Sequence, residues 1–165
     1  MVDTYNSLID KIEAYFARPH TMIKSFGEGF YDQAAQMYTD GIGGMFVVLQ
    51  NVQHLENSVS NFNLRCYFID VVRNDDNDQR EVISDQLQIS RDFINWLRED
   101  INGGAALLDV VNLPFAVPVK SVFLDYTAGC YVDVVVEVVT EMTDCAIPRD
   151  GYDQNGYFVP NYSNL

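Results

Sequence analysis

The stretch that decides the fold is CYVDVVVEVVTEMT, residues Cys130–Thr143. Every second residue from Cys130 to Met142 is apolar or threonine, while the residues between them mix acids with valines and one tyrosine. A period of two in β-branched residues predicts a long β-strand with one buried face. At about 3.3 Å per residue the stretch would reach on the order of 45 Å, well beyond an ordinary strand. We therefore expect the strand to bend at a bulge or to run beyond its own domain.

The composition of the chain is that of one ordinary globular domain. Its 165 residues are 48% hydrophobic and 21% charged, which leaves enough apolar material for a full core. No apolar window of about 18 residues occurs, so we expect no membrane span. The N-terminus lacks a basic patch before an apolar run, so we predict no signal peptide. Three widely spaced cysteines without a C-x-x-C pair are typical of reduced thiols in a cytosolic protein.

Net charge is the strongest compositional signal. The chain has 24 acidic and 10 basic residues, a net charge of −14 and a pI near 4.2. Such a surface cannot neutralise phosphates, which excludes a protein that grips nucleic acid. An acidic wall would instead let DNA pass without sticking, although acidic surfaces more commonly serve solubility. Charge therefore leaves a DNA-passing role open and excludes a DNA-binding one.

Local motifs for chemistry are absent from the sequence. His20 and His54 lie in neither an H-E-x-x-H motif nor a zinc-site spacing. The glycines of segment 41–44 lack phosphate-loop spacing and favour a turn. The acidic segment 74–78 lacks the glycine and the closing glutamate of a calcium loop. We predict no catalytic residue, no metal site and no cofactor, while an active site assembled from distant residues stays open.

Two helices are predicted from apolar residues at helical spacing. The first spans about residues 3–17, with Asp3 or Thr4 as its N-cap. The second spans about 79–101, and Asp78 with the glutamate three residues later would form a capping box. The wide apolar stripe of this longer helix indicates that it lies on a sheet.

The remaining elements are predicted to be strands. Clear alternation marks strands at 45–54 and 62–72. Segment 21–35 holds two glycines among mixed polar and apolar residues, which favours an extended or hairpin segment over a helix. Prolines interrupt segment 105–119, which indicates an edge strand, a bulged strand or a loop containing a short strand. Residues 122–127 form a further candidate strand before the long one.

This order of elements predicts an α+β fold of two layers: an antiparallel or mixed sheet with one long helix packed on it and a short N-terminal helix. Residues 1–147 would form a single domain. Residues 148–165 would form an extended, aromatic-rich C-terminal arm, which is either a mobile tail or a segment that docks on something.

Three stretches resemble the tail-terminator and tail-completion (neck-ring) proteins of tailed bacteriophages. Helix 8–16 leads into glycine-punctuated strands, of which 45–54 resembles the central strand of that family. Strand 62–72, an acidic turn and helix 81–97 resemble its strand–helix crossing. The sequence LDYTAGC at 124–130 resembles its D-x-x-A-G-aromatic entry into the last long strand, with cysteine where an aromatic residue is commoner.

The resemblance covers about residues 3–147, and the chain is also similar to proteins of crAss-like phages. It implies a non-enzymatic virion protein, assembled in the host cytoplasm, that forms a ring of six or twelve copies at the junction of portal, neck and tail. Its partners would be further copies and other neck, portal and tail proteins. DNA would pass the lumen without specific binding, and no membrane is involved. The candidate interface or lumen residues are Asp133, Glu137, Glu141, Tyr152, Tyr157, Phe158 and Tyr162.

Two other classes of function stay open. One is an acidic, non-enzymatic adaptor or binding module, whose acidic face and aromatic arm would meet a basic partner. The other is a small enzyme with a distributed active site, which would require a pocket with convergent acids.

Overall fold

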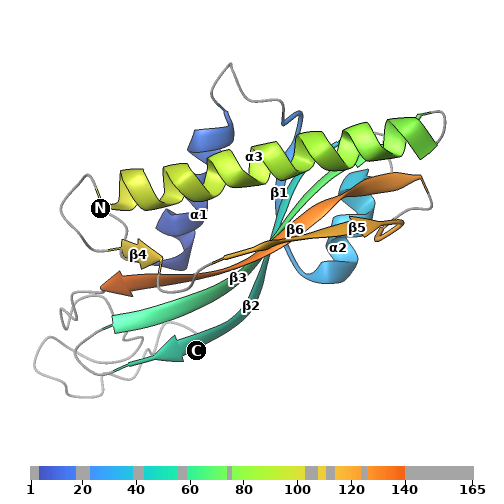
Figure 1. The fold of residues 1–165 in the computed structure, drawn as a ribbon. Coiled ribbons are helices and arrows are strands. Elements are labelled where there is room, and N and C mark those ends of the chain that lie inside the picture. Colours follow the sequence, from blue (N-terminus) through green and yellow to red (C-terminus); the bar gives the residue numbers. More distant parts are fainter. Residues whose placement is uncertain are drawn as a thin grey trace, which may run out of the picture.

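The predicted α+β fold is confirmed by a computed structural model, in which the described residues form a six-stranded mixed sheet and three helices (Figure 1). The described residues are 4–17, 23–38, 43–55, 59–73, 76–102, 108–110, 114–123 and 126–139. The C-terminal arm predicted at 148–165 lies outside them.

The sheet is centred on two long strands. Its strands are β1 (Phe26–Gly29), β2 (Gly44–His54), β3 (Val59–Val71), β4 (Leu108–Val110), β5 (Ala116–Lys120) and β6 (Thr127–Val139). The order is β1-β2-β3-β6, and both β4 and β5 pair with β6 along its other edge. Only β1 with β2 is parallel among these pairs, and the others are antiparallel.

The predicted long strand is β6, and β3 matches it residue for residue. Their register runs without a shift from the Val59–Val139 pair to the Val71–Thr127 pair. The expected bulge in β6 is therefore absent from its pairing with β3, because an equally long partner satisfies its backbone groups. Within the described residues β6 also stays inside its own sheet. The bulge lies instead in β2, where the register with β3 shifts between Leu49 and Asn51.

Two helices lie on one face of this sheet, and Figure 1 shows the longer one running along it. Helix α1 (Tyr5–Phe16) starts at the predicted cap, because Thr4 Oγ1 accepts a hydrogen bond from the Ser7 backbone N–H at 3.2 Å. Helix α3 (Asp76–Asn102) begins before Asp78, so the predicted capping box there is wrong. Asp78 lies inside the first turn, where the helix dipole favours acidic residues.

The expectation of an extended segment at 21–35 is only half correct. Strand β1 lies within it, but the chain then turns into helix α2 (Tyr31–Tyr38). The Gln33 side chain accepts the Phe30 backbone N–H at 2.8 Å at the start of this helix, and Ala34 is completely buried. Burial of α2 on the sheet therefore overrides the mixed local pattern.

Segment 105–119, which prolines interrupt, contributes two short edge strands, β4 and β5. An edge strand was one of the predicted alternatives. Pro118 lies in β5, an edge strand where a residue without an N–H is tolerated. The strand predicted at 122–127 is wrong, because residues 121–123 form a bend and β6 begins at Thr127. Ser121 has a φ of 52°, and its N–H donates to the Thr127 carbonyl at 2.7 Å.

The core is divided between the two faces of the sheet. We call the face under α1 and α3 the inner face and the opposite one the outer face. The inner cluster includes all the even-numbered residues of β6 from Cys130 to Val138, as the sequence predicts, together with Leu8, Ile12, Phe68, Phe93 and Leu97. A smaller cluster on the outer face joins α2 to the sheet through Ala34, Phe46, Val48, Tyr67 and Ile69.

Two buried thiols make the stability of the fold sensitive to alkali. Burial raises the pKa of Cys66 and raises that of Cys130 to about 11. Between about pH 9 and 11 the unfolded chain loses the Cys130 proton first, so the free energy of unfolding falls as the pH rises. We expect a slope of about 1.4 kcal/mol per pH unit from Cys130 alone.

Urea unfolding of the wild type and the Cys130→Ala variant from pH 8 to 11 measures this slope. The alkaline loss of stability should be smaller in the variant, because the Cys130 thiol is gone. It should not vanish, because Cys66 and the half-buried Tyr5, whose pKa values are also raised, still titrate in this range. Parallel pH profiles for the two proteins would contradict the prediction.

Candidate functional site

The outer face of the sheet is half covered and half bare among the described residues. Helix α2 and the bend at residues 121–123 cover the end that holds Phe46 and Ile69. No described helix packs over the other end, where β2 finishes and β3 begins. All the interface residues predicted on β6 lie on this outer face, because they occupy odd-numbered positions.

An aromatic row marks the boundary between the covered and the bare half. The Phe123 ring centroid lies 5.2 Å from that of Tyr31 and 5.1 Å from that of Tyr67, and the Tyr67 ring lies 5.8 Å from that of Tyr131. The Arg65 guanidinium carbon then lies 4.4 Å from the centre of the Tyr131 ring, a cation–π contact. The row thus holds Arg65 at the start of the bare half.

Asp133, one of the predicted interface residues, forms an ion pair with Arg65. Arg65 Nε and Nη2 donate to the two carboxylate oxygens of Asp133 at 2.7 and 2.8 Å, a bidentate arrangement. Hydrogen bonding to Asp133 is the largest cause that raises the pKa of Arg65 above its ordinary value. The negative charge of Asp133 is therefore balanced within the subunit.

We expect this ion pair to contribute little to stability. The Arg65 and Asp133 side chains are 32% and 52% exposed, so water screens their attraction. A double-mutant cycle with Arg65→Ala and Asp133→Ala, measured by urea unfolding, should give a coupling energy below about 1 kcal/mol. A coupling above about 2 kcal/mol would mean that the pair acts as a structural anchor of the sheet.

Four side-chain amides form a patch on the bare half, which we call the amide patch: Asn51, Gln53, Asn61 and Asn63. Asn51 lies opposite Asn63 in the β2–β3 ladder, and Gln53 lies opposite Asn61. The Asn63 Nδ2 donates to the Asn51 Oδ1 at 2.7 Å. The Asn61 Oδ1 is buried and accepts no hydrogen bond within the described part of the chain. The patch therefore has both satisfied and unsatisfied hydrogen-bonding groups.

Glu137, the second predicted residue that the structure describes, borders the amide patch. It lies opposite Asn61 of β3 and, on its other side, opposite Asp109 of β4. Its neighbours on the same face of β6, Val135 and Val139, are half-buried, as Glu137 is. The bare half is therefore a mixed surface of amides, valines and few charges.

The remaining predicted interface residues cannot be placed beside these. Glu141, Tyr152, Tyr157, Phe158 and Tyr162 lie outside the described residues. The sequence-based reasoning missed Arg65 and the amide patch. The alternation of Asn61, Asn63 and Arg65 with apolar residues was visible in the sequence as the polar face of a strand. The sequence did not show which residue on a neighbouring strand each of them contacts.

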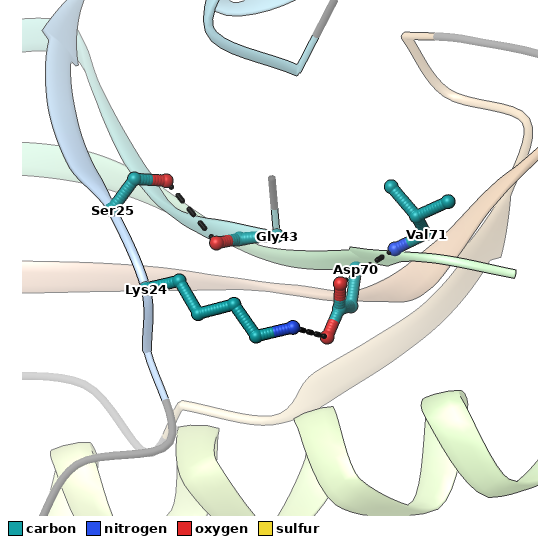
Figure 2. Close-up of polar contacts among 5 residues, drawn as sticks. All are labelled: Lys24, Ser25, Gly43, Asp70 and Val71. Atoms are coloured by element: carbon teal, nitrogen blue, oxygen red, sulfur yellow. Dashed lines mark hydrogen bonds and ion pairs between the residues drawn. The ribbon is translucent and has the colours of Figure 1, made fainter. Parts of the chain in front are cut away.

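A second polar cluster lies at the starts of β1 and β2 and the end of β3, and Figure 2 shows it in close-up. Lys24 Nζ lies 3.5 Å from Asp70 Oδ2, and Asp70 Oδ1 accepts the Val71 backbone N–H at 2.7 Å. Ser25 Oγ donates to the Gly43 carbonyl at 3.1 Å. A Cβ atom at position 43 would overlap the Asp70 carboxylate. Gly43 therefore allows the start of β2 to lie close to Asp70 of β3. This packing explains the glycine without a bound phosphate.

A pocket of about 280 Å³ opens beside this cluster, under the start of α3. Its lining residues are Lys24, Asp70, Val71, Arg73, Asp78, Glu81, Val82 and Asp85. The two cations stand among four acids, and the lining contains no histidine, cysteine or serine. No group of three or more histidine, cysteine or acidic side chains suited to a metal ion occurs among the described residues.

No protein-family model matches the chain, and no curated protein matches it at a significant level. In the part of the chain that the structure describes, no helix is long and apolar enough to span a membrane. Function must therefore be argued from the fold, the outer face and the distribution of charge.

Proposed function

We propose that the protein is a non-enzymatic structural component of a tailed-phage virion. In this role it forms an oligomeric ring at the junction of portal, neck and tail, and DNA passes through the ring. The observation that carries the proposal is the half-bare outer face. Among the described residues, α1 and α3 cover one face of the sheet, whereas β2, β3 and β6 leave a mixed apolar and amide surface on the other. Such a surface is suited to cover by a neighbouring subunit.

The distribution of charge supports a ring around DNA. Helices α1 and α3 together carry nine acidic and four basic residues, so the helical layer is strongly negative. An acidic surface repels the phosphate backbone and so keeps DNA from binding as it moves. We therefore assign the helical layer, rather than Asp133 and Glu137, as the surface nearer to the DNA path.

The experiment that tests this function is cryo-electron microscopy of the purified protein, alone and mixed with the portal protein of the same genome. We expect closed rings with a central channel, of six or twelve copies, in the sample that contains the portal protein. The alternative, an acidic adaptor, would give a stable dimer or a complex with a basic partner instead. Particles that stay monomeric in both samples, with no matching density in the virion, would reject the ring.

A further inference from the structure

We infer that the bare half of the outer face is the surface by which one copy of this chain contacts a second copy. This inference rests on the proposed function and deepens it, because it names the contact surface and the chemistry of the contact. Its core is the amide patch together with Val135 and Val139 of β6.

The first argument concerns charge. Two copies that each carry −14 repel one another, so they can meet only where the charge is locally small. The described part of the bare half carries one cation, Arg65, and two acids, Asp133 and Glu137, and Asp109 of β4 lies opposite Glu137 in the ladder. Arg65 and Asp133 neutralise each other directly. The helical layer, with nine acids and four bases, offers no comparable surface for a like-charged neighbour.

The second argument concerns hydrogen bonding. Each side-chain amide offers both a donor and an acceptor, so the amide patch can pair with an uncharged polar surface elsewhere on a second copy, as the head-to-tail contacts of a ring require. A basic partner would require acids and a phosphate would require cations, and the amide patch supplies neither. The amides that a second copy can reach are those of Asn51 and Gln53, which are exposed, whereas the Asn61 Oδ1 is shielded from solvent within the subunit.

The third argument favours the face of the sheet over its edge. Strand β1 pairs only with Met45–Val48 of β2, so no described strand adjoins the rest of that edge. The register shift between Leu49 and Asn51 interrupts this open stretch. A bulge in an edge strand opposes the addition of another strand. The amide side chains beside the bulge, by contrast, point away from the sheet on its outer face.

The expected association is weak. By strand dimensions the bare half measures roughly 300 Å², against about 800 Å² per partner in a stable complex. We therefore expect a dissociation constant in the range of about 10 µM to 1 mM for this contact alone. Stable rings would need the additional contacts of the assembled neck.

A matched pair of charge variants tests the inference. Asn51→Asp with Gln53→Glu adds two negative charges to the outer face and keeps an acceptor oxygen for Asn63. Gln88→Glu with Asn95→Asp adds the same two charges to exposed positions of α3. The two double variants have equal net charge, so they differ only in which surface carries it.

Sedimentation of the full chain over the same concentration range measures the effect. The wild type and the α3 variant should associate alike, whereas the outer-face variant should associate at least about tenfold more weakly. A wild type that stays monomeric, or two variants that behave alike, would overturn the inference. A third result would also overturn it: the wild type stays monomeric and only the outer-face variant loses thermal stability. A segment of the same chain would then cover the bare half of the outer face.

The two proposals fail in different ways. Imaged rings whose contacts lie elsewhere on the subunit would remove this inference and leave the proposed function standing. Dimers that form through the amide patch, without any ring, would support this inference and reject the proposed function.

Discussion

The Val134→Asp variant is expected to be unfolded at room temperature. Val134 lies on the inner face of β6 and is 1% exposed, opposite the equally buried Leu64 of β3. An aspartate there would have no cation among the apolar residues of the inner cluster. Burying an unpaired carboxylate costs several kcal/mol, which is comparable with the whole stability of a domain of this size.

The adjacent substitution Val135→Asp is the control for this prediction. Val135 belongs to the same strand but lies on the outer face, where it is half-buried beside Asn63. The new carboxylate can reach water, so we expect a folded protein with a loss of about 1 kcal/mol. Circular dichroism and urea unfolding of both variants provide the measurement. Equal losses would mean that the two faces of β6 are buried alike.

The Gly129→Ala variant should lose several kcal/mol of stability, although it adds only one methyl group. Gly129 has a φ of 159°, and a Cβ atom there would overlap the carbonyl oxygen of Phe68 and lie 3.0 Å from the Ile69 Cα. Both atoms belong to the backbone of β3, so no side-chain rotation relieves the contact. The two central strands would have to separate, and we expect a cost of roughly 2–4 kcal/mol.

Ala128→Gly is the matched control for this second prediction. It removes a methyl group at the neighbouring position, which is also completely buried. Its cost should be about 1 kcal/mol, from backbone entropy and a small loss of packing. Thermal unfolding of the two variants should therefore separate them clearly. If Gly129→Ala costs no more than Ala128→Gly, then β3 and β6 are not held as closely as the structure has them.

The position of Gly129 in the structure also shows where local sequence signals mislead. An Ala-Gly pair before a run of alternating residues is typical of a break in the chain, yet Ala128 and Gly129 are both part of β6. The reason is the close approach of β3, which requires a residue without a side chain. A glycine inside a strand can mark such a close approach of another backbone instead of a break.

The sequence by itself determined the class of fold, the long strand and the face of that strand that is buried. The alternation from Cys130 to Val138 specified the inner face, because a period of two is a property of neighbouring residues along one chain. The helical spacing of α1 and α3 was equally visible, since i and i+4 positions lie on one face of a helix. These signals are local, so no knowledge of the rest of the molecule was needed to read them.

Only the tertiary structure decided what the other face of that strand meets. Asp133 reads from the sequence as a free acid beside valines, but Arg65, 68 positions away, neutralises it. The amide patch likewise exists only because β2 and β3 pair in one particular register. Helix α2 forms because Ala34 and its neighbours find a surface to bury against. Register and partner depend on contacts between distant segments, which no single stretch of sequence specifies.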